Sequence, residues 1–177
     1  MPVARLFVEG RSDVAAVIAL ARCHNVQLTR VAVVSLEGIT NVRRELRAHR
    51  DGAPTAVLCD AGETGFVTRT LDADDGLDHP PVRLFVCDRD LEDELIRTLG
   101  PRRAAEVVRL AGIGDSFDRM SRQPQWRDEP LAAQLRRFAG AGAGRKELLA
   151  EAWATALLPG AVPAPLADAV AWLGATY

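Results

Sequence analysis

The sequence predicts an α/β fold, in which a central parallel sheet of about four strands carries helices on both faces and an all-helical extension follows. Three observations predict it. Short apolar runs rich in Val, Leu and Phe recur in the first part of the chain, helical patterns lie between them, and only helical patterns follow residue 100. Strands that alternate with helices are typical of parallel sheets that are covered on both faces.

The predicted strands are apolar runs of the length that fully buried strands have. They cover residues 3–8, 31–36, 55–60 and 82–87. Apolar residues at helical spacing predict the intervening and following helices, at residues 14–23, 41–49, 65–73 and 91–99. Each strand is therefore followed by a helix, which is the order of a parallel sheet whose crossover helices cover both faces, as in Rossmann-like folds.

Only helices are predicted after Pro101, which stands at a helix start. Their apolar spacing places them at residues 102–111, 116–122, 130–138, 145–158 and 166–173. Gly- and Pro-rich breaks separate them. Because we find neither an internal repeat nor a long linker, we expect residues 101–177 to pack on an α/β core of residues 1–100.

The composition predicts a soluble globular protein, since 48% of the 177 residues are hydrophobic and 26% are charged. We expect it in the cytoplasm and away from membranes, because no apolar run approaches a membrane span or a signal peptide. Three cysteines without a short pairing fit reduced thiols. A net charge of −2 argues against coating nucleic acid by charge alone but permits a local basic groove. Nothing in the pattern indicates an oligomeric state.

Carboxylates stand where three of the predicted strands end. Glu9 follows the first strand, Asp13 lies one helical turn later, and Asp60 ends the third strand. The acids after the fourth strand are Asp88, Asp90 and Glu92. Ligands of parallel α/β sheets bind beyond the carboxyl ends of the strands, and converging carboxylates repel one another unless a cation neutralises them. We therefore predict a Mg²⁺ or Mn²⁺ site at this edge.

Each acid taken singly also has a structural interpretation. Asp13 and Glu92 suit the first turn of a helix, and Asp60 suits a helix cap. The metal interpretation is favoured because the acids gather at the ends of neighbouring strands. Lys146 adds a hint, because it is the single lysine among 22 basic residues that are otherwise all arginine, and an ammonium differs from a guanidinium in donor geometry and pKa.

These motifs together resemble the Toprim domain that topoisomerases, primases and several nucleases share. The segments that carry the resemblance are VEGRSD (8–13), SLEGITN (35–41), CDAGETG (59–65), DLEDEL (90–95) and GRK (144–146). They are most similar to the nuclease domain of the OLD (overcoming lysogenisation defect) family, whose proteins join an ATPase to a C-terminal Toprim nuclease. Only the nuclease portion is recognised here, which leaves open whether an ATPase or helicase encoded elsewhere acts with it.

The resemblance implies that the chain is a bacterial-type endonuclease that hydrolyses DNA with one or two divalent ions. Its implied catalytic and metal-binding residues are Glu9, Asp13, Asp60, Glu92 and, at the scissile phosphate, Lys146. Gly62 stands where the second acid of the family's Asp-x-Asp motif belongs, so Glu63 is the candidate replacement. Asp88 and Asp90 are further candidate ligands. A non-catalytic subunit that binds nucleic acid or forms a complex, and an RNA-processing enzyme, stay as alternatives.

Two weaker patterns point to phosphate contacts. Arg43 and Arg44 lie on a basic face of the second predicted helix, and Arg145 adjoins the lysine discussed above. Gly38 and Asn41 stand at a helix start on the carboxyl edge, where backbone amides could receive a phosphate. A solvated helix face and a plain turn with a helix cap explain these patterns nearly as well.

Overall fold

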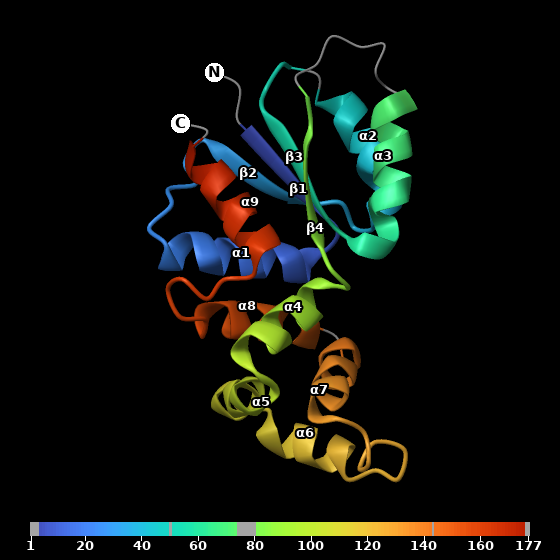
Figure 1. The fold of residues 1–177 in the computed structure, drawn as a ribbon, viewed down its shortest axis with the longest axis vertical. Coiled ribbons are helices and arrows are strands. Elements are labelled where there is room, and N and C mark those ends of the chain that lie inside the picture. The colour runs from blue at the N-terminus through green and yellow to red at the C-terminus, as the bar shows by residue number, and fades with distance from the viewer. Residues whose placement is uncertain (1–3, 50, 74–80, 143, 176–177) are drawn as a thin grey trace.

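A computed structural model describes residues 4–49, 51–73, 81–142 and 144–175 (Figure 1). It contains one parallel sheet with the strand order β2-β1-β3-β4. The strands are β1 (Ala4–Val8), β2 (Val31–Ser35), β3 (Thr55–Asp60) and β4 (Arg83–Cys87). The predicted α/β class with four parallel strands is confirmed; residue 3 of the first predicted strand lies outside the described residues.

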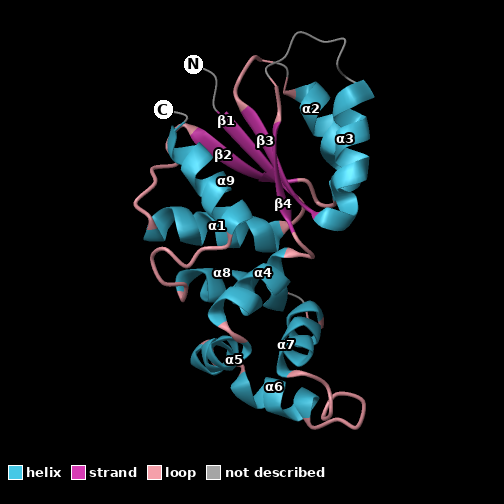
Figure 2. Ribbon diagram, viewed as in Figure 1, coloured by secondary structure: helices cyan, strands magenta, loops and turns pink. Residues whose placement is uncertain are grey.

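Alternation of side chains along β1 explains why both faces of the sheet are covered. Leu6 and Val8 are fully buried on one face, whereas Phe7 is fully buried on the other. The helices α1 (Arg11–Cys23) and α9 (Ala164–Ala175) cover the first face. The second face is covered by α2 (Val42–Ala48) and α3 (Thr64–Ala73), as Figure 2 shows.

The chain between β4 and α9 forms a helical lobe on the side of α1. Its helices are α4 (Leu91–Leu99), α5 (Pro101–Leu110), α6 (Gly114–Ser121), α7 (Leu131–Gly140) and α8 (Arg145–Thr155). The helices α5, α6 and α7 lie farthest from the sheet, whereas α8 packs along α1 (Figure 1). One continuous buried cluster joins the lobe to the sheet, and its largest member, Trp153, donates its Nε1–H to the Ala104 carbonyl at 3.0 Å.

The first helix begins three residues earlier than its apolar pattern predicts. Gly10 is the N-cap, and its backbone N–H donates to Asp13 Oδ2 at 2.8 Å. The polar residues before the apolar stripe therefore form the first helical turn. This turn holds Asp13 at the carboxyl edge of the sheet, while Glu9 lies in the bend between β1 and α1.

In the part of the chain that the structure describes, the absence of a membrane-spanning helix and the state of the cysteines bear on where the protein is expected to act. Within the described residues, no helix combines the length and the apolar character that a membrane crossing requires. The three cysteines are free thiols; Cys59 and Cys87 are buried and Cys23 is exposed.

Candidate active site

The strand order brings the predicted acids to one edge of the molecule. β1 lies beside β3, and β3 lies beside β4, so the carboxyl ends of these strands are neighbours. In the register of the sheet, Asp60 at the end of β3 pairs with Cys87 at the end of β4. Glu9 leaves β1 beside Asp60, and Glu92 enters from α4 directly after β4.

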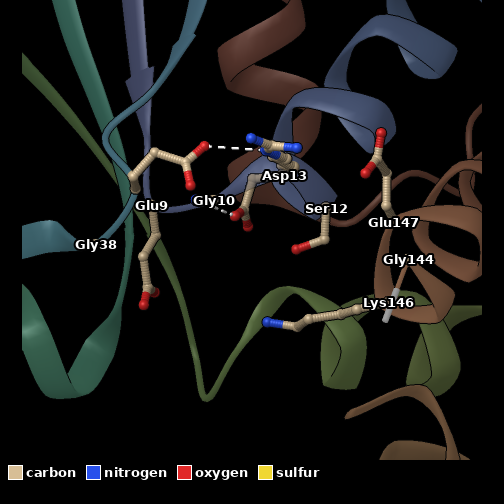
Figure 3. A pocket seen from close by; sticks show the side chains of 10 residues that line it. Glu9, Gly10, Ser12, Asp13, Gly38, Gly144, Lys146 and Glu147 are labelled. Carbon is tan, nitrogen blue, oxygen red and sulfur yellow. Dashed lines mark hydrogen bonds and ion pairs between the residues drawn. The ribbon is translucent and has the colours of Figure 1, made fainter. Parts of the chain in front are cut away.

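A pocket of about 310 Å³ opens at this edge (Figure 3). Glu9 and Asp13 line it from the sheet side, and Lys146 lines it from the start of α8. Figure 3 shows the Glu9 carboxylate and the Lys146 ammonium extending from opposite sides into the same space. The lobe therefore completes the pocket that the sheet begins.

Lys146 forms an ion pair with Glu92, with 3.3 Å between Nζ and Oε2. The Glu92 side chain is only 7% exposed, whereas that of Lys146 is 52% exposed. Burial raises the pKa of Glu92 to about 7 although the ammonium opposes this rise. Burial would lower the pKa of Lys146, but the negative charges of Glu92 and Asp13 outweigh it and raise that pKa.

The pKa values of three other carboxyls at the site are also raised. Burial, followed by the charges of Glu9 and Asp13, raises the pKa of Asp60 to about 7. Burial and the Glu9 carboxylate raise the pKa of Glu63 to about 7 as well. Burial also raises the pKa of Asp13, against the hydrogen bond from the Gly10 backbone. The site thus gathers more negative charge than its one ammonium offsets.

Two buried oxygen atoms in this cluster test whether a cation fits it. Glu63 Oε2 and Glu92 Oε1 have no hydrogen-bond partner. A buried polar atom without a partner is costly, and hard carboxylate oxygens are the ligands that Mg²⁺ and Mn²⁺ prefer. Among the described residues, no three His, Cys, Asp or Glu side chains form a ready-made cage. The chemistry of these donors suits such a cation, although the described carboxylates do not already converge on one point.

Asp90 and Asp88 are placed differently from the other acids. Asp90 is the N-cap of α4, where its Oδ1 accepts from the Asp93 backbone N–H at 2.7 Å, and its Oδ2 accepts from Arg136 Nη2. Asp88 is exposed, and its backbone N–H donates to Glu94 Oε1 at 2.9 Å. Asp90 thus caps α4 with one oxygen and holds the loop after β4 against α7 with the other.

Arg136 is expected from the sequence only to add positive charge near Lys146, and the structure gives it a partner, Asp90. It reaches Asp90 from a position 46 residues away in the chain. No spacing rule connects residues that far apart, so only the fold reveals the contact. The two adjacent arginines at positions 136 and 137 were the one local signal in the sequence, and they do not indicate a partner.

The polar groups of Gly38 and Asn41, which the sequence suggested as phosphate contacts, form hydrogen bonds in and around their own loop. The Gly38 N–H donates to the Glu9 carbonyl at 2.9 Å, and its φ of 112° is a value that favours glycine. Asn41 Nδ2 donates to the Leu36 carbonyl at 2.9 Å and to the Glu37 carbonyl at 3.3 Å. This geometry is that of a turn, which holds Gly38 at the rim of the pocket.

The three candidate arginines lie outside the pocket lining. Arg43 and Arg44 are exposed on α2, and Arg44 pairs with Glu45 at 2.9 Å. Arg145 turns away from Lys146, stacks 4.1 Å from the centre of the Phe138 ring, and donates to the Phe138 carbonyl at 3.0 Å. Arg145 therefore fastens the end of α7 to the start of α8.

Of the comparisons with known proteins, the one with solved structures identifies the fold. Neither models of protein families nor the sequences of curated proteins match this chain. Among solved structures, the C-terminal region of the Xanthomonas campestris pv. campestris OLD protein matches with a TM-score of 0.67 and 22% identity over 96% of this chain and 91% of that one. The C-terminal region of the Burkholderia pseudomallei OLD protein matches with a TM-score of 0.67 and 19% identity over 98% of both chains. The chain has the fold of the C-terminal region of OLD proteins, as its motifs predicted.

Proposed function

We propose that this chain is a divalent-metal-dependent nuclease that hydrolyses DNA phosphodiester bonds. The observation that supports it most is the acid cluster at the carboxyl edge, where Glu92 is buried against Lys146 and two buried carboxylate oxygens lack a partner. Acids whose pKa is raised by burial and mutual repulsion are expected at a site made for a cation. The likeness in fold to the C-terminal region of OLD proteins adds support.

The carboxylates would hold the cation, and the lysine would meet the substrate. The proposed ligands are Glu9, Asp13, Asp60 and Glu92, with Glu63 in the place of the second acid of the Asp-x-Asp motif. When bound, Mg²⁺ or Mn²⁺ supplies positive charge at a phosphoryl oxygen and lowers the pKa of water. Half of the Lys146 side chain faces solvent, so its ammonium can contact a phosphate and offset the negative charge that develops there.

Cleavage of supercoiled and linear plasmid tests this proposal. The protein is incubated with Mg²⁺, Mn²⁺ or EDTA beside the variants Glu9→Gln and Lys146→Ala. Matched controls are Glu129→Gln and Arg102→Ala, because both residues are exposed and lie outside the pocket lining. Metal-dependent nicking that both site variants abolish and both controls retain is the expected result.

Three results would contradict the proposal. If no plasmid is cut with either metal, or if the site variants cut as fast as the controls, the nuclease assignment fails. If a parallel RNA substrate is cut while DNA stays intact, the chemistry holds but the substrate is RNA.

A further inference from the structure

A second pocket, of about 450 Å³, lies in the helical lobe between α6 and α7. Its lining contains three arginines, an aromatic face and two side-chain amides, and none of the lining residues is acidic. These residues are Arg119, Gln123, Gln125, Trp126, Arg137 and Arg145. In a chain with a net charge of −2, such a concentration of positive charge around one hollow requires an explanation.

The wall of this pocket is held in place by the lobe itself. Trp126 is half-buried, and the Arg137 guanidinium lies 5.6 Å from the centre of its ring. The buried Gln134 donates from Nε2 to the Trp126 carbonyl at 2.8 Å and to the Glu129 carbonyl at 2.9 Å. The segment that carries the tryptophan is therefore fixed before any ligand arrives, which lowers the entropic cost of binding.

The two exposed arginines of the pocket form no ion pair among the described residues; they are Arg119 and Arg137. Two acids, Asp115 and Asp118, line a neighbouring hollow together with Arg119, and Asp118 is paired with Arg109 at 3.3 Å. Guanidinium groups that form no ion pair can bind phosphate, and an aromatic face can stack on a nucleobase. The two together match one nucleotide of a strand whose bases are unpaired, because base faces inside a duplex are already stacked.

The chain links this pocket to the candidate active site at two points. On α7, Arg136 contacts Asp90 behind the acid cluster, while its neighbour Arg137 lies over Trp126. At the start of α8, Arg145 lines the second pocket, while its neighbour Lys146 lines the first. A strand that enters the second pocket is therefore close to the corner that presents Lys146.

We propose that the second pocket binds an unpaired nucleotide of a DNA strand and thereby holds a single-stranded segment beside the candidate active site. Arg119 and Arg137 contact its phosphate, and Trp126 stacks on its base. The proposal rests on the proposed function in one respect, because it takes the bound strand to be the substrate.

Binding of a fluorescein-labelled oligo-dT of about 12 nucleotides, measured by fluorescence anisotropy in EDTA, tests the pocket without any cleavage. In Arg119→Gln and Arg137→Gln we expect a weaker Kd and a slope of log K against log salt that is smaller by about 0.7. In Trp126→Leu we expect a loss of about tenfold in affinity with an unchanged slope. Arg102→Gln, which removes an exposed charge of the same lobe outside the pocket, leaves both quantities as they are.

Each alternative has its own result. Unchanged affinity and slope in the pocket variants, or an equal loss in Arg102→Gln, would overturn the pocket as a binding site. If duplex DNA binds more tightly than oligo-dT and is weakened equally by the pocket substitutions, the assignment of an unpaired strand is overturned. If free AMP displaces the oligonucleotide from the pocket, the pocket is a site for free nucleotides and the proposal is overturned.

Far-UV circular dichroism of each variant shows whether a loss of binding is caused by unfolding. Trp126→Phe keeps an aromatic face, so it is expected to bind more tightly than Trp126→Leu if stacking is the cause; equal binding by the two variants would overturn the stacking role. If plasmid cleavage fails while these effects appear, the pocket stands and the proposed nuclease activity falls.

Discussion

Replacing Glu92 with glutamine is predicted to stabilise the protein in the absence of metal at about pH 8 and to have little effect at about pH 5. In the folded chain, burial raises the pKa of this carboxyl from 4.5 to about 7. The folded state therefore binds the proton more tightly than the unfolded state. The stability that this proton provides is complete below the unfolded pKa and is lost as the pH rises through the folded pKa.

The magnitude follows from the size of the rise. A change in pKa from 4.5 to about 7 corresponds to about 3 kcal/mol in the free energy of unfolding. Because the neighbouring acids titrate together with Glu92 and share this cost, we expect about 2 kcal/mol from the single substitution. Loss of the partner of Lys146 subtracts little, since its ammonium is half-exposed and water can replace the carboxylate.

Urea unfolding in EDTA, followed by far-UV circular dichroism at the two pH values, measures this effect. Glu129→Gln is the matched control, because Glu129 is exposed and its substitution is expected to change the free energy of unfolding by the same small amount at both pH values. Adding Mg²⁺ at about pH 8 is then expected to stabilise the parent protein more than Glu92→Gln, because a ligand of the folded state stabilises it by mass action. An equal effect of Glu92→Gln at both pH values would refute the argument that a buried, repelled charge sits at this position.

Three further outcomes follow from the same site. Gly62→Asp is expected to fold normally, because nothing lies within 4 Å of an added Cβ and the glycine does not have a positive φ. It is also expected to raise the number of Mn²⁺ ions bound per chain in calorimetric titration, and an unchanged number would contradict this. Arg136→Ala is expected to destabilise the chain by about 1–3 kcal/mol in urea unfolding, because it leaves the half-buried Asp90 without its partner. Lys146→Met is expected to tighten Mn²⁺ binding, since a competing positive charge leaves Glu92, while plasmid cleavage falls; weaker binding would show that Lys146 organises the ligands instead.

The sequence predicted that the acids of the candidate site meet at one edge of the sheet, because two rules of parallel sheets suffice for it. Buried apolar runs mark the strands, and carboxyl ends of neighbouring strands meet, so Glu9, Asp60 and Glu92 were expected together before any contact was known. Asp13 shows why single residues are harder. Its Oδ2 accepts a hydrogen bond from the Gly10 backbone N–H, as expected for a residue in the first turn of a helix. The negative charge of the same carboxylate also raises the pKa of Lys146. The structural and the metal interpretation of Asp13 are therefore compatible.

Two contacts of the site join residues that lie far apart in the chain, on different helices of the lobe or in the loop that leads into it. Arg136 meets Asp90, and Lys146 meets Glu92, through a packing that no local pattern encodes. What sets this packing is the apolar side of α8, where Leu149 and Trp153 are fully buried along α1. Because α1 begins directly after Glu9, the same helix pair that closes the core also fixes the ammonium against the acids. The position of the site's only lysine is thus a consequence of the core, which explains how an acid cluster that repels itself can be held in a stable fold.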